Sequence, residues 1–149
     1  MPEEQSAPNT NSTGNYPETF EDRLALAKDG DIWCQYLVGR MYGAGYGIDK
    51  NYSEAFRWLK NSVGQGQPQA MFYLGSMYEY ANHVHRDDKV AESWYLKSAE
   101  LGQALAQYHL AVMYYQGRGT IRLNEDPLNW YYKAAEQGHS GAQYAVGVH

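Results

Sequence analysis

Residues 106–119 read AQYHLAVMYYQGRG, and residues 130–138 read WYYKAAEQG. In the first stretch a small residue, an aliphatic residue, a methionine and a tyrosine fall at offsets of 0, +4, +7 and +8: Ala106, Leu110, Met113 and Tyr114. These offsets place the four side chains on one face of an α-helix, whereas a strand would alternate them between two faces. The two stretches therefore predict a helix, a loop that contains glycine, and a second helix.

The same pattern recurs along the chain with a period of 36 residues. The columns that keep this spacing are Gly30, Gly66, Gly102 and Gly138; Trp58, Trp94 and Trp130; Met41, Met77 and Met113; Tyr42, Tyr78 and Tyr114; and, as a small residue, Cys34, Ala70, Ala106 and Ala142. Internal repetition on this scale is typical of stacked supersecondary units. We divide the chain into repeats 31–66, 67–102 and 103–138, with a half repeat at about 18–30 and another at 139–149.

Each repeat is predicted to hold two helices. The second helices are expected at about 52–65, 88–101 and 125–137, with Asp87 or Asp88 and Asn124 as N-caps and Pro127 in a first helical turn. Because one helix pair cannot bury its own apolar face, neighbouring pairs must stack. The sequence therefore predicts an all-α, right-handed α-solenoid of antiparallel helix pairs over residues 18–149, in which Trp94→Ala is among the most destabilising substitutions.

The two quoted stretches resemble the signature of Sel-one-like (SLR) proteins, which are α-solenoids related to tetratricopeptide arrays. The resemblance covers about residues 31–149, although the second repeat reads YANHV at 80–84 where the third reads QGRGT at 116–120. It implies a scaffold or adaptor, since most members have such roles. It also implies two alternatives, a bacterial immunity protein that neutralises a toxin, and a protein that binds or hydrolyses cell-wall fragments or β-lactams. The β-lactam branch depends on paired cysteines, and this chain has only Cys34.

Composition narrows the class of partner. The 149 residues contain 12 Lys and Arg against 17 Asp and Glu, a net charge of −5, which argues against nucleic acid and anionic membranes. No apolar run has the length of a membrane span. Residues 1–17 are polar and acidic and are expected to be a disordered leader. With no export signal in the sequence, we expect a cytoplasmic protein.

Positions that vary between repeats are free to contact a partner. One stripe of the first helices varies, at offsets of 0, +4, +7 and +11, and lies beside the packing face. In related solenoids the first helices line a concave surface, so the resemblance makes this stripe the candidate site for a protein or peptide. The stripe consists of Trp33, Leu37, Arg40, Gln69, Tyr73, Ser76, Tyr80, Leu105, His109, Val112 and Gln116, with Ala44 at the end of its first row. The alternative interpretation is that Trp33, Leu37 and Leu105 belong to the core.

The sequence offers little catalytic chemistry. No serine, histidine and acid combination has a nucleophile's spacing, so we expect no enzyme, no catalytic residue and no cofactor. His83 and His85 lie two residues apart in a loop, but such a pair without other fixed ligands is weak evidence for a zinc or copper site, and we predict no metal site. Cys34 replaces alanine in the small column, which predicts a buried, inert thiol.

The half repeat at 139–149 has three interpretations. It caps the stack with its apolar residues turned inward, it docks on a second copy or a partner, or it continues into a longer array. The sequence leaves all three open, self-association included.

Overall fold

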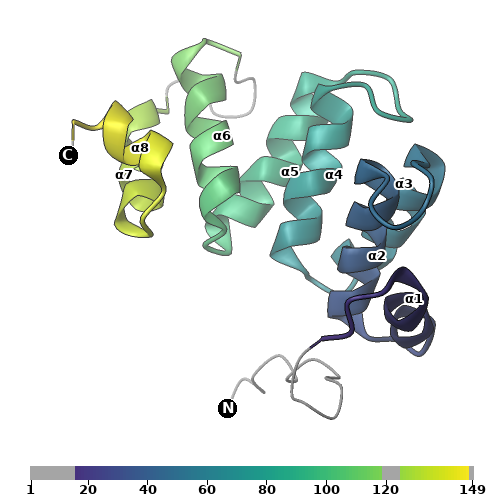
Figure 1. Cartoon of the computed structure of the whole chain (residues 1–149). Helices are drawn as coiled ribbons and strands as arrows, with labels where there is room; N and C mark the ends of the chain where they lie inside the picture. The colour runs from purple at the N-terminus through teal and green to yellow at the C-terminus, as the bar shows by residue number, and fades with distance from the viewer. Residues whose placement is uncertain (1–15, 119–124, 148–149) are drawn as a thin grey trace. The chain divides into compact units, whose positions relative to one another are not determined.

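The computed structural model describes residues 16–118 and 125–147, and within these residues the chain forms eight α-helices and no strand (Figure 1). The helices are α1 (Phe20–Lys28), α2 (Ile32–Ala44), α3 (Tyr52–Val63), α4 (Pro68–Glu79), α5 (Asp88–Glu100), α6 (Ala104–Tyr115), α7 (Pro127–Glu136) and α8 (Ser140–Ala145). This confirms the all-α class and the two-helix repeat. The first helices of the repeats are α2, α4 and α6, and the second helices are α3, α5 and α7.

The chain divides into two compact units, an N-terminal unit up to Ala70 and a C-terminal unit from Met71. The boundary lies inside α4. In the N-terminal unit α2 packs against α1 and α3, and in the C-terminal unit α6 packs against α5 and α7, which in turn packs against α8.

The columns that recur every 36 residues form the two cores. The N-terminal core contains Phe20, Ala27, Cys34, Val38, Met41 and Trp58. The C-terminal core is richer in rings and is built around Phe72, Tyr95, Leu110, Met113, Tyr114, Trp130 and Tyr131. All four members of the small column are fully buried, so a helix face without bulk is needed at that position in every repeat.

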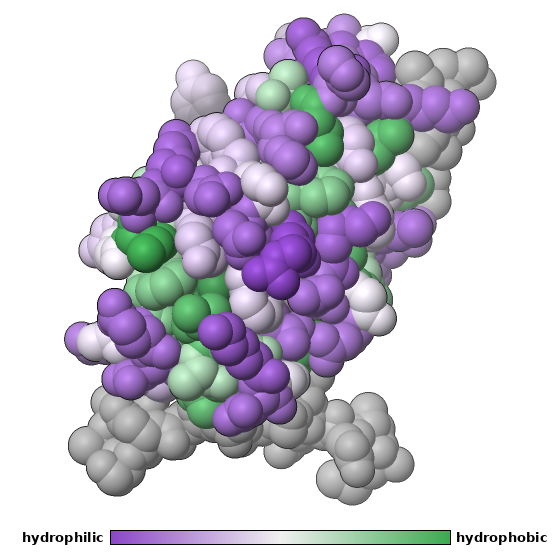
Figure 2. All heavy atoms as spheres, turned by 90° about the vertical axis from the view of Figure 1, so that its right-hand side faces the viewer, coloured by the Kyte–Doolittle hydropathy of each residue, from purple (hydrophilic) through white to green (hydrophobic). Residues whose placement is uncertain are grey.

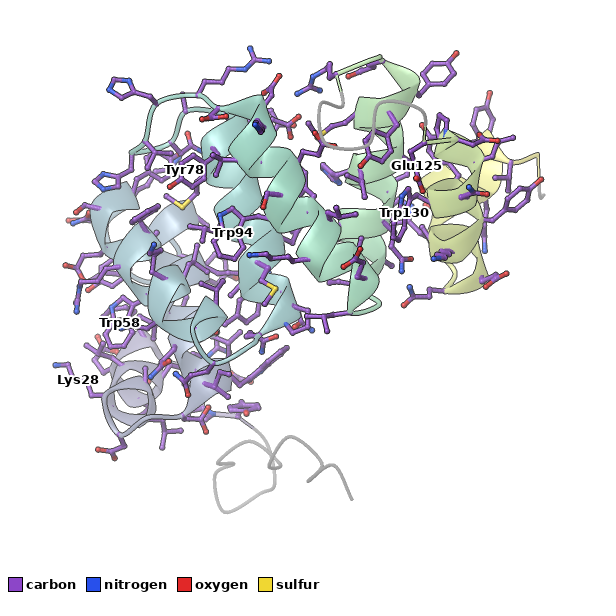
Figure 3. The ribbon with its side chains drawn as sticks, turned by 180° about the vertical axis from the view of Figure 1, so that it is seen from behind. Lys28, Trp58, Tyr78, Trp94, Glu125 and Trp130 are labelled. Carbon is purple, nitrogen blue, oxygen red and sulfur yellow. The ribbon has the colours of Figure 1, made fainter. Side chains whose placement is uncertain are left out.

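The tryptophan column is less uniform than the sequence predicts. Trp58 and Trp130 are buried, but Trp94 is only half-buried, with the Lys97 ammonium 4.8 Å from the centre of its ring (Figure 3). The neighbouring Tyr95 is fully buried instead. Tyr95 is therefore a core residue of the middle repeat, and truncation there is expected to be strongly destabilising.

The helix starts follow capping chemistry. Asp87 is the N-cap of α5, and its Oδ1 accepts hydrogen bonds from the backbone N–H groups of Lys89 and Val90, at 3.1 Å each. The predicted N-cap Asn124 lies outside the described residues, and the N-cap of α7 is Asp126. That helix begins later than predicted because Pro127 takes its first position, where a missing N–H costs nothing.

The first helices of all three repeats end with the same bond, a backbone N–H donating to a methionine carbonyl at 2.9 Å. The pairs are Tyr46 with Met41, Asn82 with Met77, and Arg118 with Met113. This hydrogen bond requires that the residue just before the one that donates its N–H have a left-handed backbone. The first and third repeats supply Gly45 and Gly117, both at φ 71°, whereas the middle repeat supplies Ala81 at φ 57°.

The loop after α4, which we call the middle loop, therefore has the left-handed backbone of the loops after α2 and α6 but lacks their glycines. Two residues further on, His83 has a φ of 71° where the first repeat has Gly47 at 77°. Left-handed backbone is unfavourable for residues with a Cβ, so this loop is strained at two positions.

A relay of glutamine side chains joins successive helices. Gln65 donates to the Oε1 of Gln35 at 2.6 Å, and Gln35 donates to the Ala27 carbonyl at 3.2 Å. In the third repeat Gln137 donates to Gln107 at 2.8 Å, and Gln107 donates to the Ala99 carbonyl at 3.1 Å. The corresponding positions of the middle repeat hold Met71 and Leu101, so both members of the pair change together.

The two ends of the chain bear on earlier predictions. The predicted disorder of residues 1–17 concerns mainly residues 1–15, which lie outside the described residues. Tyr16 packs against Trp33 with ring centres 6.3 Å apart. In the half repeat at 139–149, Ala142 is buried and Val146 packs against the C-terminal core, while Tyr144 is exposed.

Candidate partner-binding surface

The variable stripe and the recurring columns differ in burial. None of the eleven stripe residues is buried: Arg40, Tyr80, Leu105 and Gln116 are exposed, and Trp33, Leu37, Gln69, Tyr73, Ser76, His109 and Val112 are half-buried. The neighbouring Val38, Leu74 and Leu110 are fully buried. The distinction between packing columns and variable columns, drawn from sequence, therefore agrees with burial, and Trp33, Leu37 and Leu105 lie outside the buried core.

In the N-terminal unit, Leu37 and Arg40 line a recess with a volume of about 220 Å³. Its walls are completed by Arg23 from α1, by Met41 and Ala44 from α2, and by Tyr46 from the loop that follows. Leu37, Arg40 and Ala44 lie about one helical turn apart along α2. Their side chains therefore lie on one face of the helix. The recess combines an apolar wall with two guanidinium groups.

Arg23 is fixed at the edge of this recess. Its Nε donates to the Pro17 carbonyl at 2.6 Å, and one terminal nitrogen lies 3.6 Å from the Met41 sulfur. These two contacts hold the plane of the guanidinium, which lowers the entropy that binding would otherwise remove.

Arg40 lines the recess from α2. Its guanidinium carbon lies 5.9 Å from the centre of the Tyr36 ring, and its terminal nitrogen is 3.4 Å from the Tyr36 hydroxyl. The ring restrains the arginine while its head remains exposed. Trp33 extends the same helix face, with its ring centre 5.1 Å from that of Tyr36.

In the C-terminal unit, two stripe residues have structural contacts of their own. The ring centres of Tyr73 and His109 each lie 4.9 Å from that of Phe72, edge to face. The Nδ1 of His109 lies 2.9 Å from the Leu105 carbonyl. Tyr73 and His109 therefore pack on the core with one edge of the ring and expose the other edge to solvent. Their substitution would change the stability of the fold as well as the proposed binding surface.

The end of the stripe in this unit adjoins a buried polar network. Tyr95 donates to one oxygen of Glu79 at 2.8 Å, and Arg118 pairs with the other at 2.5 Å. Burial, and then the Glu79 carboxylate, raise the pKa of Tyr95, so its hydroxyl stays protonated and donates. Gln116 accepts a hydrogen bond from Arg118 at 2.9 Å. The network ties the loop after α6 back to α4.

Metal and thiol chemistry have little support in the described part of the chain. No three His, Cys, Asp or Glu side chains gather there around one point, and His83 and His85 are both exposed. Cys34 is fully buried, and burial together with the Asp31 carboxylate raises the pKa of its thiol to about 12, which confirms the predicted buried thiol. Of the helices described, none is both long and apolar enough to cross a membrane.

The face drawn in Figure 2 is mostly hydrophilic, with apolar residues in small areas bordered by polar ones.

Sequence reasoning missed three residues of the recess, Arg23, Met41 and Tyr46. Met41 belongs to a recurring column and was assigned to packing alone. Arg23 lies in the half repeat before the first full one, and it would have been found by extending the 36-residue register, which aligns it with Leu59, Tyr95 and Tyr131.

Comparison with known proteins supports the repeat assignment. The family model described as Sel1 repeat matches residues 34–66, 68–103 and 104–139. A Sel1 repeat protein from Oxalobacter formigenes is similar in structure, with 33% identity, a TM-score of 0.71, and coverage of 85% of this chain and 96% of that one.

Two further solved structures share the fold. The Escherichia coli protein c5321, a protective antigen with an SLR fold, is 30% identical with a TM-score of 0.74; the match covers 85% of this chain but only 27% of that one. The Pseudomonas aeruginosa immunity protein Pa5087 is 20% identical with a TM-score of 0.62, covering 96% of this chain and 53% of that one, which shows the fold alone. The comparison with curated proteins found no match.

Proposed function

Since this chain belongs to the Sel1 repeat family, we propose that it is a non-catalytic interaction module that binds a protein or peptide through the variable columns of its first helices. The observation that carries the proposal is the recess beside Leu37 and Arg40, where these two variable residues and Met41 of a packing column line a concave site with mixed chemistry.

The chemistry of this recess suits a polypeptide partner. Arginine and aromatic side chains dominate the binding energy of protein interfaces when they surround a small apolar depression. Leu37 and Met41 supply the apolar wall, Tyr46 is 75% exposed, and Arg40 supplies a restrained cation. The net charge of −5 disfavours a nucleic acid at the same place.

The stripe of the C-terminal unit is included in the proposal for the same reason. Tyr73 and His109 vary between repeats and are half-buried, so each presents part of its ring. Self-association through residues 139–149 and a cytoplasmic location remain predictions.

The experiment uses a partner captured from the native host by cross-linking, and then purified. Its affinity is measured for the unchanged chain, for Arg40→Ala, for Tyr73→Ala and for Arg57→Ala. Arg57 is the matched control, because it is an exposed arginine of the N-terminal unit that pairs with Glu54 on its own helix at 2.7 Å. We expect Arg40→Ala and Tyr73→Ala each to weaken binding by about tenfold or more, and Arg57→Ala by less than twofold.

Thermal unfolding of each variant separates binding from folding. The proposal requires that Arg40→Ala bind weakly while it melts at the temperature of the unchanged chain. Unaltered affinity in both stripe variants would refute it, as would a loss of affinity that is equally large for Arg57→Ala.

A further inference from the structure

We propose that the recess of the N-terminal unit binds the C-terminal residue of a partner polypeptide, with its carboxylate at Arg23 and Arg40 and an aliphatic side chain against Leu37, Met41 and Ala44. This inference rests on the proposed function and specifies the ligand of that site.

The charges that line the recess are of one sign. Arg23 and Arg40 are its only charged wall residues among those described, and the other four walls are Leu37, Met41, Ala44 and Tyr46. Two guanidinium groups beside an apolar wall are complementary to an anion that carries a hydrocarbon group. In a chain with a net charge of −5, this is a local exception that favours one anionic group rather than a polyanion.

The donors of Arg23 are partly assigned. Its Nε is occupied by the Pro17 carbonyl at 2.6 Å, and one terminal nitrogen faces the Met41 sulfur at 3.6 Å, which is a weak acceptor. A carboxylate is a far stronger acceptor than a thioether, so a ligand carboxylate would replace that contact at a guanidinium already fixed in place.

Comparison of the repeats shows that packing does not require these arginines. Arg23 occupies the register of Leu59, Tyr95 and Tyr131, which are 3%, 0% and 8% exposed. The equivalents of Arg40 are Ser76 and Val112. Arg23 itself is half-buried, so at this position a cation that stays partly exposed replaces the core residue of the other repeats.

The size of the recess selects among carboxylate sources. At about 220 Å³ it is smaller than sites for drug-sized ligands, and it accommodates about one residue. An internal glutamate offers a carboxylate with only two methylenes, which leaves most of the apolar wall uncovered. A chain terminus offers a carboxylate and a full aliphatic side chain on one residue, which matches both parts of the recess.

The test uses three small probes with the full chain: N-acetyl-L-leucine, N-acetyl-L-leucinamide, and the α-amide of N-acetyl-L-glutamic acid. NMR follows the Nε–H signals of Arg23 and Arg40 and the methyl signal of Met41. We expect N-acetyl-L-leucine to shift all three signals saturably, with a Kd of about 1–10 mM, as its size dictates. The leucinamide should bind at least tenfold more weakly, and the glutamate amide at least fivefold.

Two variants locate the binding. Arg40→Gln should weaken N-acetyl-L-leucine at least fivefold, while Arg57→Ala should change its affinity less than twofold. Arg40 is exposed, so its replacement leaves the core intact, and the Met41 signal of the free variant verifies this.

Several results would overturn the inference. Absence of saturable shifts with N-acetyl-L-leucine removes the site, and equal affinity for the glutamate amide removes the assignment to a chain terminus. If the purified partner still depends on Arg40 while N-acetyl-L-leucine does not bind, the proposed function stands and this inference fails. If N-acetyl-L-leucine binds while the partner ignores Arg40, the proposed function fails instead.

Discussion

Ala81→Gly should stabilise this protein, although glycine usually destabilises. Ala81 has a φ of 57° and its neighbour Asn82 donates to the Met77 carbonyl at 2.9 Å, so the loop holds a left-handed residue that carries a Cβ. This conformation costs a residue with a Cβ about 1–2 kcal/mol. Glycine loses about 0.5–1 kcal/mol more backbone entropy on folding than alanine does. The difference predicts a gain of about 0.5–1 kcal/mol in the free energy of unfolding.

The mirror substitution is Gly117→Ala, in the same register of the next repeat. Gly117 has a φ of 71°, and a Cβ built there meets no atom within 4 Å, so the change introduces conformational strain without a clash. We expect it to destabilise by about 1 kcal/mol. The pair therefore isolates backbone conformation from packing within one compact unit.

Urea unfolding followed by circular dichroism measures both variants against the unchanged chain. The midpoint should rise for Ala81→Gly and fall for Gly117→Ala, with slopes that do not change. The melting temperature should move by about 2–4 °C per kcal/mol. A midpoint that falls for Ala81→Gly, or one that rises for Gly117→Ala, would refute the conclusion that the middle loop stores strain.

Three further predictions concern the C-terminal unit. Gln107→Met and Gln137→Leu should each destabilise by about 1–2 kcal/mol, whereas the double variant, which reproduces the middle repeat, should lose about 0.5–1 kcal/mol less than the sum in a urea double-mutant cycle. Burial, and then the charge of His109, lower the pKa of His139, whose Nδ1 accepts from the Ala142 N–H at 3.2 Å and so needs a neutral ring. The unfolded chain therefore binds a proton at His139 more readily than the folded chain does. The free energy of unfolding should accordingly decrease as the pH falls below about 6.5. Urea titrations at pH 7.5 and 5.0 should show a smaller decrease for His139→Asn than for the unchanged chain. Arg118→Ala should destabilise by about 2–3 kcal/mol, because it removes the cation paired with the buried Glu79, and Glu79→Gln in the same chain should restore part of that in thermal melts.

The fold was predictable because packing is periodic. The small column at Cys34 and its equivalents is fully buried in every repeat. Because the same packing contact recurs in each repeat, the same residue type recurs every 36 positions. The start of α5 followed from Asp87 because capping depends on local geometry, whereas α7 begins two residues later than predicted, with Asp126 as its N-cap. The shortfall of burial at Trp94 was not predictable, because a recurring residue type does not ensure a recurring environment.

The candidate site was only half predictable. Leu37 and Arg40 were found because they vary where packing does not demand a residue type. Arg23 was missed because the half repeat before the first full one was not aligned in the 36-residue register, and because only the fold shows that Arg23 lies beside α2. The left-handed backbone of the middle loop could not be predicted from its residue types. The hydrogen bond to the Met77 carbonyl requires this conformation, although Ala81 and His83 do not favour it.

The glutamine relay has a consequence for the fidelity of assembly. Self-similar modules can dock in the wrong order, because one first helix resembles another. Gln107 placed where Met71 belongs would face Leu101, which has no amide to donate to it, and would thus lose the bond that Gln137 provides. The amide and hydrocarbon pairs thus favour the packing of each first helix on the second helix of its own repeat over the packing of α6, in the place of α4, on the second helix of the middle repeat.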